Sequence, residues 1–204
     1  MAGRVLGPDG NPVADARVIV LYDFQANTTW QHSFEPAGEM LTDNDGRYAI
    51  TVDKISDRFS DGRNIEKQTL CVLASKPGLG PDQVDVSEGS PEDTNLELAA
   101  TTSTLRGQIV DLEGRGVPGV QIRLVELKTA AKPLEEWLEK AKDNPASVSE
   151  EMRVESGGLP VAYFPKENVV RAVDALRLPV LTTDAQGRFE LPGLGDDREV
   201  ILRI

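Results

Sequence analysis

The chain has 204 residues, and its 34 Asp and Glu residues outnumber its 22 Lys and Arg residues, which gives a formal net charge of −12 at pH 7. This excess of carboxylates repels phosphate and excludes nucleic acid as an expected partner, and no apolar run approaches the ~20 residues that cross a bilayer. Hydrophobic residues make up 39% of the chain, enough for a core in one large or two ordinary domains.

The N-terminal region reads as short strands separated by tight turns. A strand pattern begins at once with Arg4, which leaves no room for a signal peptide, so none is expected in this chain. The sequence does not decide the cellular compartment of the protein. Turn residues fill 7–10, and the strand over 16–21 alternates so that its even-numbered residues are expected to face inward. A second turn over 43–46 precedes another strand, and further strands are expected at Leu70 to Ala74, Gln83 to Val86 and Asn95 to Leu98.

The chain contains an internal repeat. The segment from Gly3 to Leu21 aligns without a gap on Gly107 to Val125, an offset of 104, and TDNDGRYAI from Thr42 aligns on TDAQGRFEL from Thr183, an offset of 141. The second copy must therefore carry 37 additional residues between the two blocks. This predicts two tandem domains, 1–100 and 101–204, the second with an insertion over 127–181.

The insertion is where helix is expected. Leu134, Trp137, Leu138 and Ala141 have the i, i+3, i+4, i+7 spacing of an amphipathic helix, which predicts a helix over 133–142 after Pro133. A second helix is predicted from Asn168 to Leu176, although its valines would also suit a strand. The residues between the helices, 144–160, are expected to form a loop.

Short strands at roughly 8–12-residue spacing with Gly and Pro at the turns favour antiparallel sandwiches over parallel α/β units. The predicted fold is therefore all-β, with two tandem antiparallel Greek-key β-sandwiches. The lone Cys71 cannot form an intramolecular disulfide, so packing alone must hold this fold together.

The repeated G-x-V/I opening, Asp/Glu-Gly turn and T-D-x-x-G-R-Y/F block resemble the carboxypeptidase regulatory-like domain, a prealbumin-like (transthyretin-like) sandwich of about seven strands. The resemblance covers most of 3–98 and the flanks of the second copy, 107–125 and 182–204. It implies a non-catalytic structural or interaction module, found in tandem within larger bacterial proteins and slightly favouring an extracytoplasmic location. The implied partners are other domains of the parent protein or another protein.

The second copy departs from this pattern at its end. Val200 to Ile204 matches Leu70 to Ala74, so the closing strands of the second sandwich are expected to be missing. Because open edges are avoided in natural domains, the hypothesis is that the chain is a piece of a longer protein or borrows a strand from a partner.

Candidate binding residues are few. Trp30 and His32 lie together in a polar loop where an aromatic face could stack on a sugar, so a carbohydrate-binding module is one alternative; the loop could equally bury Trp30 against its own sandwich. One His cannot supply the two-His, two-Tyr iron site of the related dioxygenases, and the chain ends differently from the transthyretin-like hydrolases. No catalytic residue and no cofactor are expected.

The clustered carboxylates of Asp43 and Asp45 invite a calcium site or a metal-assisted hydrolase as a further alternative. The aligned segment of the second copy keeps only Asp184 of these carboxylates, whereas a turn explains both copies. We therefore expect turns and no metal at these positions.

Overall fold

The structure is a computed structural model, and it describes residues 1–26, 32–53, 65–86, 93–130, 139, 142–144, 166–178, 180–196 and 198–204. The chain is all-β, as predicted, with one 3₁₀ turn as a named helical element. All of the named strand pairs are antiparallel except that of β1 with β7, which is parallel. We call residues 1–100 the N-terminal half and residues 101–204 the C-terminal half.

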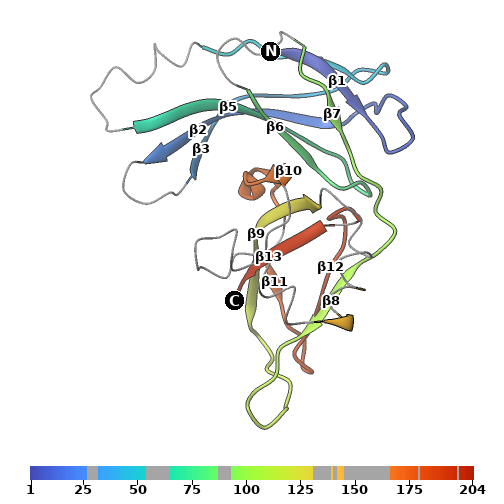
Figure 1. Cartoon of the computed structure of the whole chain (residues 1–204), viewed down its shortest axis with the longest axis vertical. Coiled ribbons are helices and arrows are strands. Elements are labelled where there is room, and N and C mark those ends of the chain that lie inside the picture. The colour runs from blue at the N-terminus through green and yellow to red at the C-terminus, as the bar shows by residue number, and fades with distance from the viewer. Residues whose placement is uncertain are drawn as a thin grey trace.

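The N-terminal half consists of two facing sheets (Figure 1). One sheet has the order β3-β2-β5-β6 and the other has the order β4-β1-β7. Their aliphatic faces enclose a core that includes Val5, Val18, Val72 and Leu96, all of which are fully buried. The strands are β1 (Ala2–Leu6), β2 (Arg17–Ala26), β3 (His32–Leu41), β4 (Arg47–Ala49), β5 (Ile65–Ser75), β6 (Asp82–Val86) and β7 (Leu96–Glu97).

The C-terminal half repeats part of this plan. Its central strand β9 is flanked by β10 and β13, and β11 pairs with the beginning of β9, while β12 pairs with β8. The elements are β8 (Leu105–Gln108), β9 (Gln121–Ala130), β10 (Lys166–Val170), η1 (Val173–Leu176), β11 (Leu181–Thr182), β12 (Arg188–Leu191) and β13 (Arg198–Arg203).

The two halves differ at their closing strands, as the sequence comparison predicted. β13 pairs with β9 as β5 pairs with β2, and in the N-terminal half β6 and β7 complete the two sheets. Among the described residues of the C-terminal half, no strand takes the place of β6 or β7. The expected strands at Leu70 to Ala74 and Gln83 to Val86 are confirmed within β5 and β6.

The helix predicted from Asn168 to Leu176 is wrong. The residues up to Val170 form strand β10 on β9, and only 173–176 make a single 3₁₀ turn. The β-branched Val169 and Val170 suit a strand that has a partner, and pairing with β9 satisfies their backbone groups. Most of the helix predicted over 133–142, and all of the loop over 144–160 except Asn144, lie outside the described residues.

The predicted alternation in β2 was also incomplete. Val18 and Val20 face the N-terminal core as expected, but Ile19 and Leu21 are buried as well, in a second core that the C-terminal half completes. In β9 the expected pattern holds at Ile122, which is 1% exposed. A register shift between Leu124 and Glu126 then brings an odd-numbered residue into the core at Leu127.

Candidate functional site

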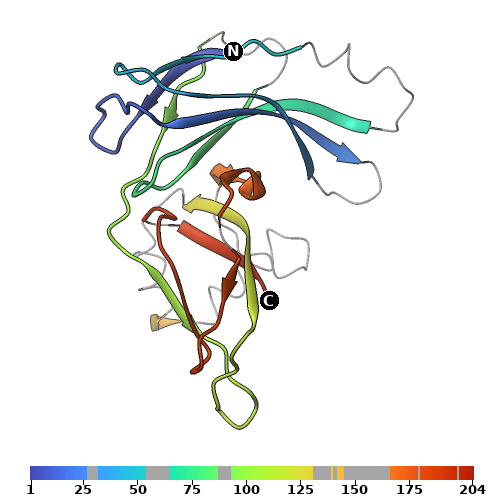
Figure 2. The same ribbon diagram turned by 180° about the vertical axis from the view of Figure 1, so that it is seen from behind.

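The contact between the two halves is the most elaborate site in the described part of the chain. The outer face of the N-terminal sheet contributes Ile19, Leu21, Cys71 and Leu73 to a hydrophobic cluster that it shares with the C-terminal half. The C-terminal residues of this cluster are Leu127, Val170, Ala172, Val173, Leu191 and Leu194. Both views show β10 and η1 lying between the large N-terminal sheet and the strands β9 and β13 (Figures 1 and 2).

A buried glutamine anchors the start of η1 on the N-terminal sheet. Gln83 on β6 is 3% exposed, and its Oε1 atom accepts hydrogen bonds from the backbone N–H groups of Arg171 and Ala172 at 3.1 and 3.0 Å. The Arg171 guanidinium also donates to the carboxylate of Asp85 on the same strand. Since β10 ends at Val170, these bonds satisfy backbone donors that the strand has released.

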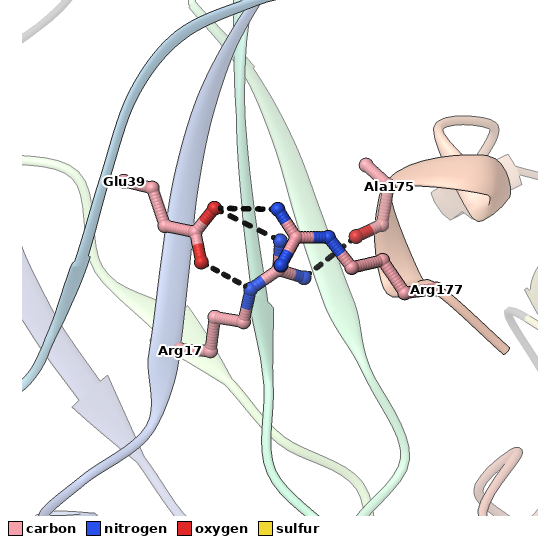
Figure 3. Close-up of polar contacts among 4 residues, drawn as sticks. All are labelled: Arg17, Glu39, Ala175 and Arg177. Atoms are coloured by element: carbon pink, nitrogen blue, oxygen red, sulfur yellow. Dashed lines mark hydrogen bonds and ion pairs between the residues drawn. The ribbon is translucent and has the colours of Figure 1, made fainter.

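A second polar group holds the end of η1 (Figure 3). Arg17 on β2 donates to both carboxylate oxygens of Glu39 at 2.6 and 3.0 Å, and it donates to the carbonyl oxygen of Ala175 at 2.6 Å. Arg177 donates to Glu39 from the C-terminal half at 3.2 Å. The hydrogen bond from Arg17 lowers the pKa of Glu39 below its ordinary value, so this carboxylate stays charged and links the two halves.

The halves also meet through backbone alone. Gly80 lies so close to Gly195 that a Cβ atom on Gly80 would stand 2.5 Å from the Cα atom of Gly195. Beside this contact, Asp196 accepts hydrogen bonds from the backbone N–H groups and hydroxyls of Thr102 and Ser103. The hydroxyl bond from Ser103 is the largest cause of a lowered pKa at Asp196. The connecting segment is therefore fastened to the C-terminal half.

A pair of charged residues lies next to the glycine contact. Asp82 is 3% exposed, and burial raises its pKa although its carboxylate accepts a hydrogen bond from the N–H of Glu97 at 2.8 Å. Burial likewise lowers the pKa of Arg198, which the charge of Asp82 partly offsets. The carboxylates of Asp82, Asp85 and Glu39 come from the N-terminal half and face guanidinium groups of the C-terminal half, so the two surfaces are complementary in charge.

An open groove of about 730 Å³ runs along this contact. Leu79, Leu176 and Leu178 line it together with the connecting residues Thr102 and Ser103. Its exposed surface is mostly apolar although charged and hydroxyl side chains also line it, and no aromatic side chain is among the described residues of its lining. The described residues of the whole chain contain no group of three or more His, Cys, Asp or Glu side chains that could hold a metal ion.

The aspartates considered as calcium ligands form turns. One carboxylate oxygen of Asp43 accepts the backbone N–H groups of Asp45 and Arg47, and Asp184 makes the same two bonds in the second copy. The turn prediction is confirmed at both positions. The Asp/Glu-Gly turn of the second copy is closed in the same way by Asp111, an aspartate that the repeat comparison did not single out.

The threonine of the repeated block has an equally clear role. The Oγ1 atom of Thr42 accepts the N–H of Ala16 at 2.9 Å and donates to the carbonyl of Val13 at 2.6 Å. Thr183 repeats both bonds in the second copy. The T-D-x-x-G-R block therefore recurs because one threonine and one aspartate fix the backbone at this corner of each copy.

The structure does not describe the side chains of the two predicted carbohydrate contacts, Trp30 and His32. Trp30 lies outside the described residues, and of His32 only the backbone is described, at the start of β3. The carbohydrate hypothesis therefore stays a prediction. The residues that do form the site, such as Gln83, Arg171 and Gly80, were missed because their partners lie far away in the sequence. Only the unusual aliphatic content of both faces of β2 signalled that a second surface would cover it.

None of the helices among the described residues is long and apolar enough to span a membrane. No protein-family model and no curated protein matches the chain. A solved structure of the streptococcal ancillary pilin is similar over 95% of this chain, with 12% sequence identity and a TM-score of 0.27. The match covers 49% of the pilin chain, so this chain spans about half of that length, and a TM-score this low carries no argument about function.

Proposed function

We propose that the chain is a non-catalytic structural module of a larger protein, in which two prealbumin-like, carboxypeptidase regulatory-like domains are locked in one orientation. In this proposal the domains are residues 1–100 and 101–204, with the insertion at 127–181. The repeated Thr42 and Thr183 corners support a common ancestry of the two domains. A bacterial parent protein with an extracytoplasmic location follows from the family resemblance.

The observation that carries this proposal is the shared hydrophobic cluster between the halves. Flexibly linked domains meet through small, polar contacts, so relative motion is expected unless the interface is large and apolar. Here Ile19, Leu21 and Leu73 are at most 2% exposed because the C-terminal half covers them. Separation of the halves would expose these side chains to water, which is unfavourable at about 25 cal/mol per Å² of apolar surface. The polar contacts around Gln83 and Glu39 then select a single orientation.

Pulsed electron–electron resonance between two spin labels tests the proposal directly. Asp9→Cys and Glu113→Cys place labels on exposed turns, one in each half, while native Cys71 is buried and stays unlabelled. We expect one narrow distance distribution, unchanged by moderate salt because the cluster is apolar. As the control, the pair Asp9→Cys and Asp45→Cys lies within the N-terminal half and reports the width that the labels themselves contribute. A distribution much broader than this control would contradict a locked orientation.

A further inference from the structure

Two arginines face each other on the outer surface of the N-terminal half. Arg4 on β1 stands directly opposite Arg47 on β4 in the antiparallel register. Side chains at opposite positions of a strand pair share one face, with their Cβ atoms about 4.5–5.5 Å apart, so like charges there are unfavourable. The sheet of β1 and β4 lies on the side of the N-terminal half away from the C-terminal half (Figures 1 and 2), so the locked contact does not involve these arginines.

Neither arginine has a strong acidic partner. The Arg4 side chain forms no ion pair and no hydrogen bond with a residue that the structure describes, and only its backbone N–H is bonded, to the Oδ1 atom of Asn95 at 3.0 Å. The Nη1 atom of Arg47 lies 3.5 Å from the Oδ2 atom of Asp45, but these side chains are 60% and 68% exposed. Water screens such a pair, so it offsets little of the repulsion between the arginines.

The same face of the C-terminal half carries a matched pair of charges. The internal repeat aligns Ala2 with Arg106 and Ala49 with Glu190. Arg106 and Glu190 stand opposite each other on β8 and β12 and form an ion pair at 2.9 Å. The N-terminal half has two small alanines in place of this acid and this base.

The repeat also folds without a second arginine on this face. Arg4 is aligned with Gln108, whose amide donates to the carbonyl oxygen of Gln186 at 2.8 Å. Gln108 stands opposite Arg188, which is aligned with Arg47. The fold therefore does not require the pair of Arg4 and Arg47, and this pair points to a ligand that neutralises it.

The two alanines leave a hollow beside the arginines. It has a volume of about 790 Å³, and Ala2, Ala49, Arg4 and Arg47 all line it. Met40 forms one wall, since its Sδ atom accepts the backbone N–H of Ala49 at 3.2 Å. The neighbouring leucine of β3, which is 56% exposed, also lines the hollow. An aliphatic wall therefore stands next to two guanidinium groups.

The remaining lining limits the chemistry of the ligand. The carboxylates of Asp43 and Asp93 also line the hollow, and they repel a doubly charged phosphate more strongly than a singly charged carboxylate. Tyr48 is 3% exposed and donates its hydroxyl to the carbonyl oxygen of Thr94, so it offers no ring face to a sugar. These features favour a carboxylate that has an aliphatic group beside it.

We propose that this hollow binds an acidic side chain from a peptide segment of a partner protein, whose carboxylate bridges Arg4 and Arg47. Guanidinium groups hold a carboxylate through paired N–H···O bonds, and an aliphatic neighbour of the acid covers Met40 and Leu41. The bound carboxylate supplies the charge that Glu190 supplies in the C-terminal half. This inference goes beyond the proposed structural role, because a spacer needs no partner on this face, and its test is independent of the distance measurement above.

A nuclear magnetic resonance titration with a terminally blocked Leu-Glu-Leu-Glu-Leu peptide tests the proposal. The side-chain Nε–Hε signals of Arg4 and Arg47 should shift and reach saturation, whereas the signal of Arg188 should stay unchanged. The Leu-Gln-Leu-Gln-Leu peptide lacks the carboxylates and should shift none of these signals. Absent shifts at Arg4 and Arg47, an equal shift at Arg188 or equal shifts by the two peptides would overturn the proposal. Tighter binding of glucuronate or inorganic phosphate than of the acidic peptide would also overturn it.

Three variants make the test quantitative, and the amide spectrum of each reports its fold. Arg4→Gln introduces the residue type of Gln108 and should weaken peptide binding by about tenfold or more, because a hydrogen bond between charged groups is lost. Arg188→Gln is the matched control and should bind as the native chain does. Ala49→Glu introduces the acid of Glu190 diagonally across from Arg4 and should block the peptide. Undiminished binding in Arg4→Gln or in Ala49→Glu contradicts the proposed site.

Discussion

Replacement of Gly80 by alanine should force the two halves apart. The added Cβ atom would lie 2.5 Å from the Cα atom and 2.8 Å from the N atom of Gly195, and 3.0 Å from the carbonyl oxygen of Leu194. These are backbone atoms and cannot rotate away, whereas ordinary carbon contacts are about 3.5–4.0 Å. The halves must therefore separate by about 1 Å, and overpacking of this kind lowers the free energy of unfolding by about 1–3 kcal/mol.

The effect should be visible at one amide group far from the substitution in sequence. A displacement of about 1 Å takes the 3.0 Å hydrogen bond from the N–H of Ala172 to Gln83 outside the bonding range. Hydrogen exchange at Ala172 should therefore accelerate in Gly80→Ala, while equilibrium urea unfolding measures the loss of stability.

Gly78→Ala is the matched control for this experiment. Gly78 has φ +85 and nothing within 4 Å of an added Cβ, so alanine there incurs only the backbone penalty of about 1 kcal/mol. Exchange at Ala172 should be unchanged in this control. If Gly80→Ala left both the stability and the exchange at Ala172 as in the native chain, the close contact between the halves would be refuted.

Three further predictions concern single residues, each checked by urea unfolding. Thr42→Val keeps the side-chain shape but removes both bonds of the hydroxyl, and should lower the free energy of unfolding by about 1–3 kcal/mol. Asp15 has φ 52 where the second copy has Gly119, so Asp15→Gly should be neutral or stabilising by about 0.5 kcal/mol, and Gly119→Asp should destabilise. Arg17 lowers the pKa of Glu39 below its ordinary value of 4.5, so the charged carboxylate stabilises the fold fully at pH values above 4.5. This contribution is lost as the pH falls through the lowered pKa, and Glu39→Gln should remove that part of the pH dependence of stability.

Each of these predictions has its own contradicting result. An unfolding free energy of Thr42→Val equal to that of the native chain would show that the corner bonds are not needed. A clear loss of stability in Asp15→Gly, or none in Gly119→Asp, would mean that the left-handed backbone at these aligned positions carries no strain. If the unfolding free energy of Glu39→Gln depended on pH as in the native chain, the ion pair between Arg17 and Glu39 would not stabilise the fold.

The local structure was predictable from the sequence because its determinants are local. The aspartate that closes each repeated turn accepts from amide groups two and four residues further along, and a glycine ends each of these turns, Gly46 and Gly187. The alternation in β2 likewise identified Val18 and Val20 as core residues. The internal repeat then strengthened each assignment, since a turn explained both copies where a calcium site explained one.

The contact between the halves could not be predicted in the same way. Gln83 bonds to a backbone group 88 residues away, and Arg17 bonds to one 158 residues away, so no local pattern encodes either partner. The segment that contains Val169 and Val170 read as a helix because apolar spacing alone does not distinguish a short helix from a strand. The partner strand β9 decided the outcome, and its position depends on the whole fold.

Differential scanning calorimetry of the whole chain measures whether the two halves unfold as one cooperative unit. If the shared cluster and the polar contacts lock the halves into one unit, the chain should unfold in a single transition whose calorimetric and van't Hoff enthalpies agree. Two resolved transitions, or a calorimetric enthalpy well above the van't Hoff value, would show that the halves unfold independently and would contradict the account.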